Sequence, residues 1–253
     1  RQLVLERMGA IERQAGLADT LQVLLGQRPQ PYVEDRIAFI PIDGILAQGV
    51  APIEKACGVT DMEDVVAWVD EAVVSAEVDA IFFRVNSPGG SVTGMPELAA
   101  QIADIRNVKP SMWHTKSICA SGGVYVTAGC LLGYATASAE VGSVGAYTYV
   151  LDDSEAFRMM GLKAEVIAND GAVLKGRGAP GVPLSRAQLD DIQASVNHAG
   201  KRFQDFVRSN RKSIDESVFK AGMFDGDQAV EVGLIDHVAS ESQAIADLKK
   251  MIA

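Results

Sequence analysis

Apolar positions along the chain follow two patterns, one typical of buried strands and one typical of amphipathic helices. Short apolar runs at Ile37–Ile42, Ala80–Val85 and Ser111–Ile118 predict buried strands. Between them, apolar residues recur every three or four positions, which predicts helices over Asp61–Ser75 and Met95–Arg106. Strands that alternate with helices indicate parallel βαβ units in a layered α/β domain.

The two ends of the chain are helical in pattern. Leu3, Val4, Met8 and Ile11 fall on one helical face, and the loop GQRPQP at 26–31 then breaks the pattern. We therefore expect a helical extension over residues 1–31 and a main domain over 32–253.

In the second half of the chain, the pattern predicts a strand at 164–167 and a long helix at 185–209. Shorter helices are predicted at 213–220, at 226–232 and from 240 onward.

Composition indicates a folded, soluble chain. Its 253 residues are 48% hydrophobic, enough to bury a core, and the formal net charge is −10. An acidic chain without a cluster of Lys and Arg is not expected to bind nucleic acid. No apolar stretch approaches the roughly 18 residues of a membrane span, and the first residues are too charged for a signal peptide. We expect a cytoplasmic location, with membrane association only if an anchor precedes this sequence.

Cysteine and histidine usage argues against a metal centre. The three cysteines, Cys57, Cys119 and Cys130, are widely spaced and form no CxxC motif. The three histidines form no HExxH motif. We expect free thiols and no metal.

Two glycine-rich turns each follow a predicted strand directly. The first is NSPGGSV at 86–92 and the second is CASGG at 119–123. In a parallel sheet, such turns meet at the edge where the strands end. The N–H groups of Gly90 and Gly122 would then converge on a carbonyl oxygen beside Ser121, as an oxyanion hole requires. Taken singly, each turn has a plainer explanation: a tight turn into a helix, and a serine that caps a helix N-terminus.

A nucleophilic serine needs a base, and the histidines are poorly placed to serve. His114 lies within a predicted strand, His198 in the long helix and His237 after the last predicted strand. Lys175 is the best placed alternative, since it lies in the glycine-rich loop GAVLKGRG with an apolar lead-in. A free lysine titrates near about 10.4, so burial must lower its pKa to about 7 to 8 for this role.

The other explanation for Lys175 is an ordinary solvated loop lysine. Lys116 and Lys163 also have the pattern of solvated residues at strand ends.

With these residues assembled, the chain resembles the S49 peptidase family. The resemblance spans roughly residues 35–240. It is carried by five blocks in one order: 86–92, 109–123, 141–147 (VGSVGAY), 161–167 (GLKAEVI) and 222–236 (GMFDGDQAVEVGLID). It implies a ClpP/crotonase-like α/β spiral and a Ser-Lys dyad that works without a cofactor.

The resemblance also implies a role for each site residue. Ser121 matches the nucleophile and Lys175 the general base. Gly90 and Gly122 match the oxyanion donors, and Ser143 matches a serine that orients the lysine. The lysine loop is one residue longer than the family pattern, so Lys163 is the fallback base.

The expected function is that of a serine endopeptidase acting on extended protein or peptide segments, in phage or prophage capsid or scaffold processing. A homo-oligomer is expected by the same resemblance. The alternatives are a signal-peptide-degrading peptidase of the signal peptide peptidase A type without its anchor, a crotonase-like enzyme acting on acyl-CoA, and a non-catalytic assembly subunit. The acyl-CoA enzyme would need a paired acid near the oxyanion hole and a basic CoA site, and neither stands out.

Overall fold

The computed structural model describes residues 28–253. The helices expected in residues 1–26 therefore lie outside the described residues. The described chain divides into two units. The first comprises the described residues up to Gly145 together with Phe203–Ala253, and the second is Ala146–Arg202.

An eight-stranded, mostly parallel sheet forms the centre of the first unit. Its strand order is β1-β2-β5-β6-β7-β10, and β8 and then β9 branch from the end of β6. Strands β2, β5, β6, β7, β8 and β10 run parallel, whereas β1 and β9 are antiparallel to their neighbours. The bounds are β1 Tyr32–Glu34, β2 Ile37–Asp43, β5 Ala80–Ser87, β6 Ser111–Ala120, β7 Leu132–Ala135, β8 Glu140–Gly142, β9 Met223–Phe224 and β10 His237–Val238. The strands predicted at 37–42, 80–85 and 111–118 are thus confirmed as β2, β5 and β6, and the α/β class is confirmed with them.

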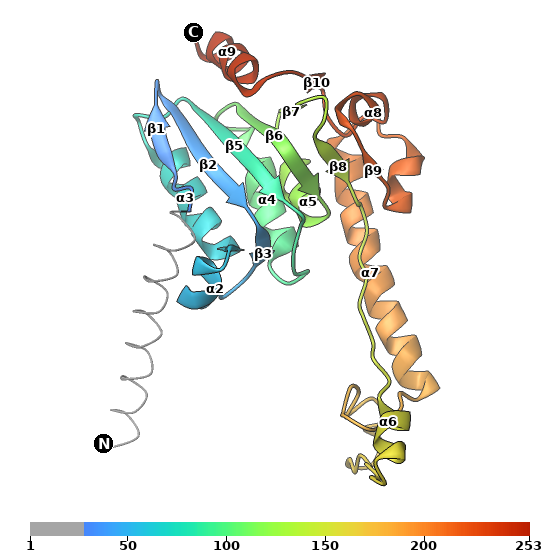
Figure 1. Ribbon diagram of the computed structural model, residues 1–253. Coiled ribbons are helices and arrows are strands. Elements are labelled where there is room, and N and C mark those ends of the chain that lie inside the picture. The colour runs from blue at the N-terminus through green and yellow to red at the C-terminus, as the bar shows by residue number, and fades with distance from the viewer. Residues whose placement is uncertain (1–27) are drawn as a thin grey trace, which may run out of the picture. The chain divides into compact units, whose positions relative to one another are not determined.

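Helices cover both faces of this sheet. Helices α3 (Met62–Val74), α4 (Met95–Ile105) and α5 (Gly122–Thr127) lie together on one face, as Figure 1 shows. Their apolar residues share one buried cluster with the sheet and with the last turns of α7 (Arg186–Asn210). On the other face, α9 (Glu241–Ile252) contributes to a second, smaller cluster.

Smaller elements complete the first unit. They are β3 (Ile45–Ala47), α2 (Pro52–Ala56), β4 (Val59–Asp61), the 3-10 helix Glu216–Lys220 and α8 (Gly226–Glu231). Strands β3 and β4 pair only with each other and form a separate two-stranded sheet. The sequence pattern missed both strands, because three-residue strands show almost no periodicity.

The second unit has helices but no strand among its described residues. It contains α6 (Ser154–Met159) and the first turns of α7, which confirms the predicted long helix. The predicted strand Ala164–Ile167 is wrong, since this segment is irregular. The physical reason is that the unit offers no described strand with which it could form a ladder. No apolar side chain of residues 146–202 belongs to the buried core.

Within residues 28–253, no helix is both long enough and apolar enough to cross a membrane.

Candidate active site

Ser121 occupies a sharp turn between a strand and a helix. Strand β6 ends at Ala120, and α5 begins at Gly122. Ser121 stands at the N-cap position with φ 51° and ψ −118°, a region that residues other than glycine rarely adopt. Its side chain makes no capping hydrogen bond to α5. The simple explanation of Ser121 as a helix cap therefore fails, and its hydroxyl is left for another use.

The surrounding backbone holds this strained turn in place. The Ser121 N–H donates to the Gly142 carbonyl at 2.8 Å, and the Ser121 carbonyl accepts from the Tyr125 N–H at 3.0 Å. An unfavourable backbone conformation of this kind costs about 1 to 3 kcal/mol and persists only where the fold enforces it. Such strain is concentrated at functional sites, so it marks Ser121 as a candidate nucleophile.

The two glycine-rich turns lie against each other. A Cβ built on Gly89 would lie 2.7 Å from both the Gly122 nitrogen and the Ser121 Cβ. A Cβ built on Gly122 would lie 3.2 Å from the Gly90 nitrogen. Glycine is therefore required on both turns, because any side chain would push the two backbones apart. The predicted oxyanion donors, Gly90 and Gly122, are neighbours in the structure.

The N–H of Gly90 faces away from its neighbouring strand. Leu46 forms an isolated parallel bridge with Gly90, in which the Leu46 N–H donates to Gly89 O and the Leu46 carbonyl accepts from Ser91 N, each at 2.9 Å. In a parallel bridge the central residue points its own N–H to the opposite side. Gly122 lies beside the Gly90 nitrogen, since a Cβ built on Gly122 would be 3.2 Å from it. Gly122 is the first residue of α5, so its N–H has no partner within the helix.

Sequence reasoning missed two residues that support this arrangement. The Ser87 hydroxyl accepts a hydrogen bond from the Gly89 N–H at 3.1 Å and donates to the Gly44 carbonyl at 2.7 Å. Met95 packs beneath Gly122, where a Cβ would lie 2.4 Å from the methionine methyl carbon. Ser87 stands inside the NSPGG motif at a buried position, which was the available signal.

Ser143 lies next to the backbone that holds Ser121. Strand β8 pairs with the end of β6, so that Gly142 stands opposite Ala120. Ser143 follows directly, with φ 55°, and its N–H donates to Gly222 O at 2.8 Å. The first unit thus brings together Ser121, Ser143 and both glycine turns.

Lys175 belongs to the second unit. Its N–H donates to Ala172 O at 3.0 Å, and its carbonyl accepts from the Gln188 side chain at 3.0 Å, which fixes the turn to the start of α7. Its side chain is exposed. Lys163, in the same unit, is also exposed and forms an ion pair with Glu165 at 2.5 Å. The hydroxyl and the amide donors therefore lie in one unit, and both candidate lysines lie in the other.

Among the other bases considered from the sequence, His198 lies exposed on α7 in the second unit, and the rest are engaged elsewhere in the first unit. His114 is buried, and its Nε2 lies 3.1 Å from the Ala239 carbonyl, between β10 and α9. Burial lowers the pKa of its imidazole. The His237 ring packs on Tyr134 with centroids 4.9 Å apart, and Lys116 forms an ion pair with Glu241 at 2.8 Å. These contacts argue against a Ser-His-Asp triad.

Residues 28–253 contain no cluster of three or more His, Cys, Asp or Glu side chains that could hold a metal ion.

Comparison with known proteins identifies similar chains of two kinds. Residues 103–253 match the model of peptidase family S49. A putative signal peptide peptidase SppA of Enterococcus faecium is 32% identical over 177 residues, which covers 68% of this chain and 51% of that protein.

Phage proteins are the second kind. The head-tail preconnector protein GP5 of Enterobacteria phage P21 is 23% identical over 91% of this chain and 46% of its own length. The capsid assembly protease C of Escherichia phage lambda is 22% identical over 86% of this chain and 49% of its own length. The chain thus spans about half the length of these curated relatives.

Proposed function

Because this chain belongs to peptidase family S49, we propose that it cleaves peptide bonds by a Ser-Lys dyad formed by Ser121 and Lys175. The observation that carries the proposal is the Ser121 turn. Its backbone is strained, its hydroxyl does not cap the helix, and two glycine turns lie against it. A helix cap would need none of these features.

In this mechanism, Lys175 in its neutral form removes the proton of the Ser121 hydroxyl. The oxygen attacks the substrate carbonyl, and the N–H groups of Gly90 and Gly122 stabilise the tetrahedral oxyanion. The lysine then passes the proton to the leaving amine, which gives an acyl-enzyme. Water activated by the same lysine hydrolyses this ester and regenerates the hydroxyl. Ser143 would hold the lysine amine in line by a hydrogen bond.

A neutral lysine requires an enclosed site, because water favours the charged ammonium. Within the second unit, however, the Lys175 side chain is exposed. The same unit exposes a set of large apolar side chains: Tyr147, Tyr149, Leu151, Leu162, Ile167 and Val173. Apolar surface of this extent gains about 25 cal/mol per Å² when it is covered. We propose that the chain forms a homo-oligomer in which this surface is covered and the lysine is enclosed.

The finer architecture is part of the proposal. The parallel order β2-β5-β6, with a glycine turn after β5 and another after β6, supports a ClpP/crotonase-like spiral. We place the peptidase domain at residues 32–253, preceded by an extension at 1–31.

For the substrate, we propose capsid or scaffold proteins of a phage or prophage, bound in extended form. The support is the name of the lambda relative, a capsid assembly protease, and its match to 86% of this chain. The second candidate is degradation of signal peptides. It is favoured by the SppA relative, which has the higher identity of 32%. The phage assignment would place the enzyme in the procapsid.

Substitution of Ser121 tests the mechanism. Ser121→Ala is expected to lower cleavage of an unfolded protein such as casein by about 10⁴-fold or more, since loss of the nucleophile removes covalent catalysis. Labelling by a fluorophosphonate probe should be lost as well, while the circular dichroism spectrum stays unchanged. Undiminished cleavage by Ser121→Ala would dismiss the dyad. A wild-type chain that neither cleaves nor reacts with the probe would favour a non-catalytic assembly role.

A further inference from the structure

The small sheet formed by β3 and β4 borders the first glycine turn. Strand β3 pairs with β4 along one edge, with Leu46 opposite Thr60. Along its other edge it holds Gly89 and Ser91 through the two hydrogen bonds of Leu46, each 2.9 Å long. The direction of the Gly90 N–H therefore depends on where β3 lies. A pair of three-residue strands is too short to fix that position alone.

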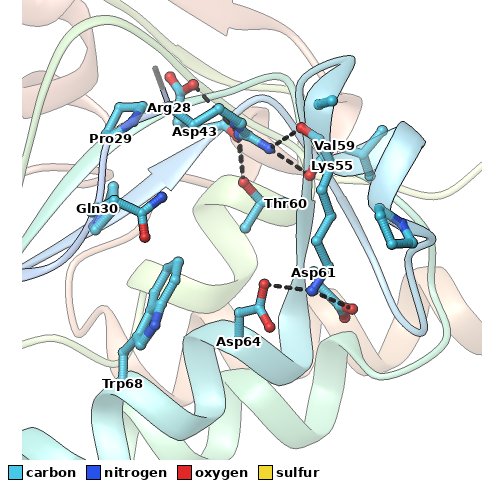
Figure 2. A pocket seen from close by; sticks show the side chains of 13 residues that line it. Arg28, Pro29, Gln30, Asp43, Lys55, Val59, Thr60, Asp61, Asp64 and Trp68 are labelled. Atoms are coloured by element: carbon cyan, nitrogen blue, oxygen red, sulfur yellow. Dashed lines mark hydrogen bonds and ion pairs between the residues drawn. The ribbon is translucent and has the colours of Figure 1, made fainter. Parts of the chain in front are cut away.

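Arg28 supplies the missing attachment, as Figure 2 shows. Its Nη1 donates to the carbonyls of Val59 at 2.5 Å and Lys55 at 3.2 Å. Its Nη2 donates to the Asp43 carbonyl at 2.5 Å and to the Thr60 hydroxyl at 2.9 Å. The side chain is 17% exposed. One guanidinium thus joins the end of β2, the end of α2 and strand β4.

Asp43, which accepts a hydrogen bond from Arg28, is also connected to the first glycine turn through Asn86. The Asp43 carboxylate accepts a hydrogen bond from the Asn86 side chain at 2.8 Å, and the Gly44 N–H donates to Asn86 O at 2.8 Å. Asn86 is the first residue of the NSPGG motif. Space at this junction is tight, because a Cβ on Gly44 would lie 2.0 Å from the Gly58 carbonyl oxygen. Movement of Asp43 would therefore be transmitted to the turn.

We propose that Arg28 is a positioning residue for the oxyanion hole, acting through β3 and Asp43 on the N–H of Gly90. The proposal rests on the function proposed above, since it assigns the Gly90 N–H to the transition state. Arg28 itself touches no reacting atom. Its planar fork can serve several carbonyls at once, whereas a lysine ammonium is a single point of charge. Loss of the fork leaves three carbonyl oxygens without this donor and lets β3 shift.

A shift of β3 should impair catalysis more than binding. An oxyanion donor acts on the charge that develops in the transition state, so its misalignment lowers the rate constant and leaves affinity nearly unchanged.

The Arg28 side chain also lines a cavity of about 270 Å³ together with Pro29, Lys55 and Trp68. Truncation to alanine would remove the guanidinium and two methylene groups, and would leave space for a free guanidinium ion beside this cavity. Free guanidinium ion could then take the place of the missing group.

The experiment measures the inactivation of Ser121 by a fluorophosphonate probe in the full chain. For Arg28→Ala, we expect the maximal inactivation rate to fall about tenfold while the apparent affinity for the probe changes less than about twofold. Guanidinium chloride at non-denaturing concentration should restore most of the rate and leave wild type unaffected. The matched control is Arg36→Ala, which removes an exposed arginine paired with Asp79 at the opposite end of β2. It should react like wild type.

Each outcome separates this proposal from the function on which it rests. A wild-type chain that does not react at Ser121 overturns the proposed function. A reactive wild type with an equally reactive Arg28→Ala overturns the role of Arg28 alone. A slow variant that guanidinium does not restore, or one that loses affinity instead of rate, makes Arg28 merely structural and also overturns it. Should Arg28→Ala not fold, Arg28→Lys is expected to fold and to react more slowly, and an unslowed Arg28→Lys would contradict the proposal.

Discussion

The two units of this chain differ in how much of their structure they hold fixed. In the first unit, helices cover both faces of a sheet, and most large apolar side chains are buried. Ser121 is locked between Gly142 and Tyr125 by backbone hydrogen bonds. In the second unit, by contrast, no apolar side chain is in the buried core, and Lys175 is exposed.

This difference separates the groups of the proposed mechanism into those that need fixed geometry and the base, which also needs to be shielded from water. The nucleophile and its oxyanion donors need fixed geometry, because preorganised dipoles act without reorganisation during the reaction. In the structure, Ser121 and the two glycine turns lie together within the first unit. The proposed base needs dehydration as well as position, and the proposed oligomer would supply it by covering the apolar surface of the second unit. In the proposed oligomer, assembly would therefore complete the base, whereas the turns around Ser121 already lie together in the first unit.

The largest expected effect comes from removing the amine of Lys175, the proposed base in the second unit. Lys175→Met keeps an unbranched chain but no amine, so we expect cleavage of casein to fall by about 10³-fold. The free energy of unfolding should stay near the wild-type value, because the side chain is exposed and the turn is held by backbone bonds. Peptidase assays and urea unfolding check both expectations.

Lys163→Met is the matched control, since Lys163 is an exposed lysine of the same unit. It should keep its activity. If Lys163→Met were inactive and Lys175→Met active, the base would be Lys163.

A substitution in the first unit should damage geometry instead of proton transfer. In Gly89→Ala, the new Cβ would lie 2.7 Å from the Gly122 nitrogen and the Ser121 Cβ, at a φ of 102°. The two turns must then separate, and we expect about a 10²-fold loss of activity from the misaligned oxyanion donors. The rate of fluorophosphonate labelling measures the loss at Ser121 directly.

Gly49→Ala controls for backbone strain. Gly49 also has a positive φ, 68°, but open space around its Cβ. It should lose about 1 kcal/mol of stability and keep its activity. Equal activity losses in both variants would mean that strain, and not the contact between the turns, is responsible.

The sequence predicted the first unit far better than the second. Runs such as Ala80–Ser87 are buried on both faces of the sheet, so local hydrophobicity and tertiary burial agree. The segment 164–167 has the same local pattern, yet it is irregular, because a strand also needs a neighbour and the sequence of one segment does not show whether one exists. Local hydrophobic patterns therefore predicted strands correctly where a neighbouring strand of the same unit is present to pair with them.

The site was predicted to a similar extent. The contact between the turns at Gly90 and Gly122 follows from two adjacent parallel strands, which periodicity identifies. The attachment of β3 by Arg28 could not be predicted, since it joins residues up to 32 positions apart through backbone carbonyls that every residue has. The pairing of Ser121 with Lys175 stays a prediction that depends on the resemblance.

A smaller effect concerns the pH dependence of the first unit. Burial lowers the pKa of His114, and the bond to the Ala239 carbonyl and the charge of Glu241 oppose this only partly. In the unfolded chain, the His114 imidazole therefore takes up a proton near its ordinary pKa of about 6.5. In the native chain, the same imidazole stays neutral until a lower pH. The contribution of His114 to the free energy of unfolding is therefore fully present above about pH 6.5, and it declines as the pH falls below that value.

His114→Gln should flatten the decline between pH 7 and 5 in urea unfolding. The control His237→Gln, at an exposed ring, should keep it. If both variants declined like wild type, the acid sensitivity would arise from other groups.

The smallest expected effect lies in the thiols, and it reports on the first unit alone, because Cys57, Cys119 and Cys130 all belong to that unit. Burial raises the pKa of Cys119 and of Cys130 to about 12, so neither is a thiolate at neutral pH, whereas Cys57 is exposed. A thiol reagent at pH 8 should therefore modify one cysteine rapidly and leave cleavage unchanged. The other two should react only on unfolding, at the same rate in wild type and in Lys175→Met. Faster exposure of Cys119 in the lysine variant would show that the second unit stabilises the first, which contradicts the independence of the two regions.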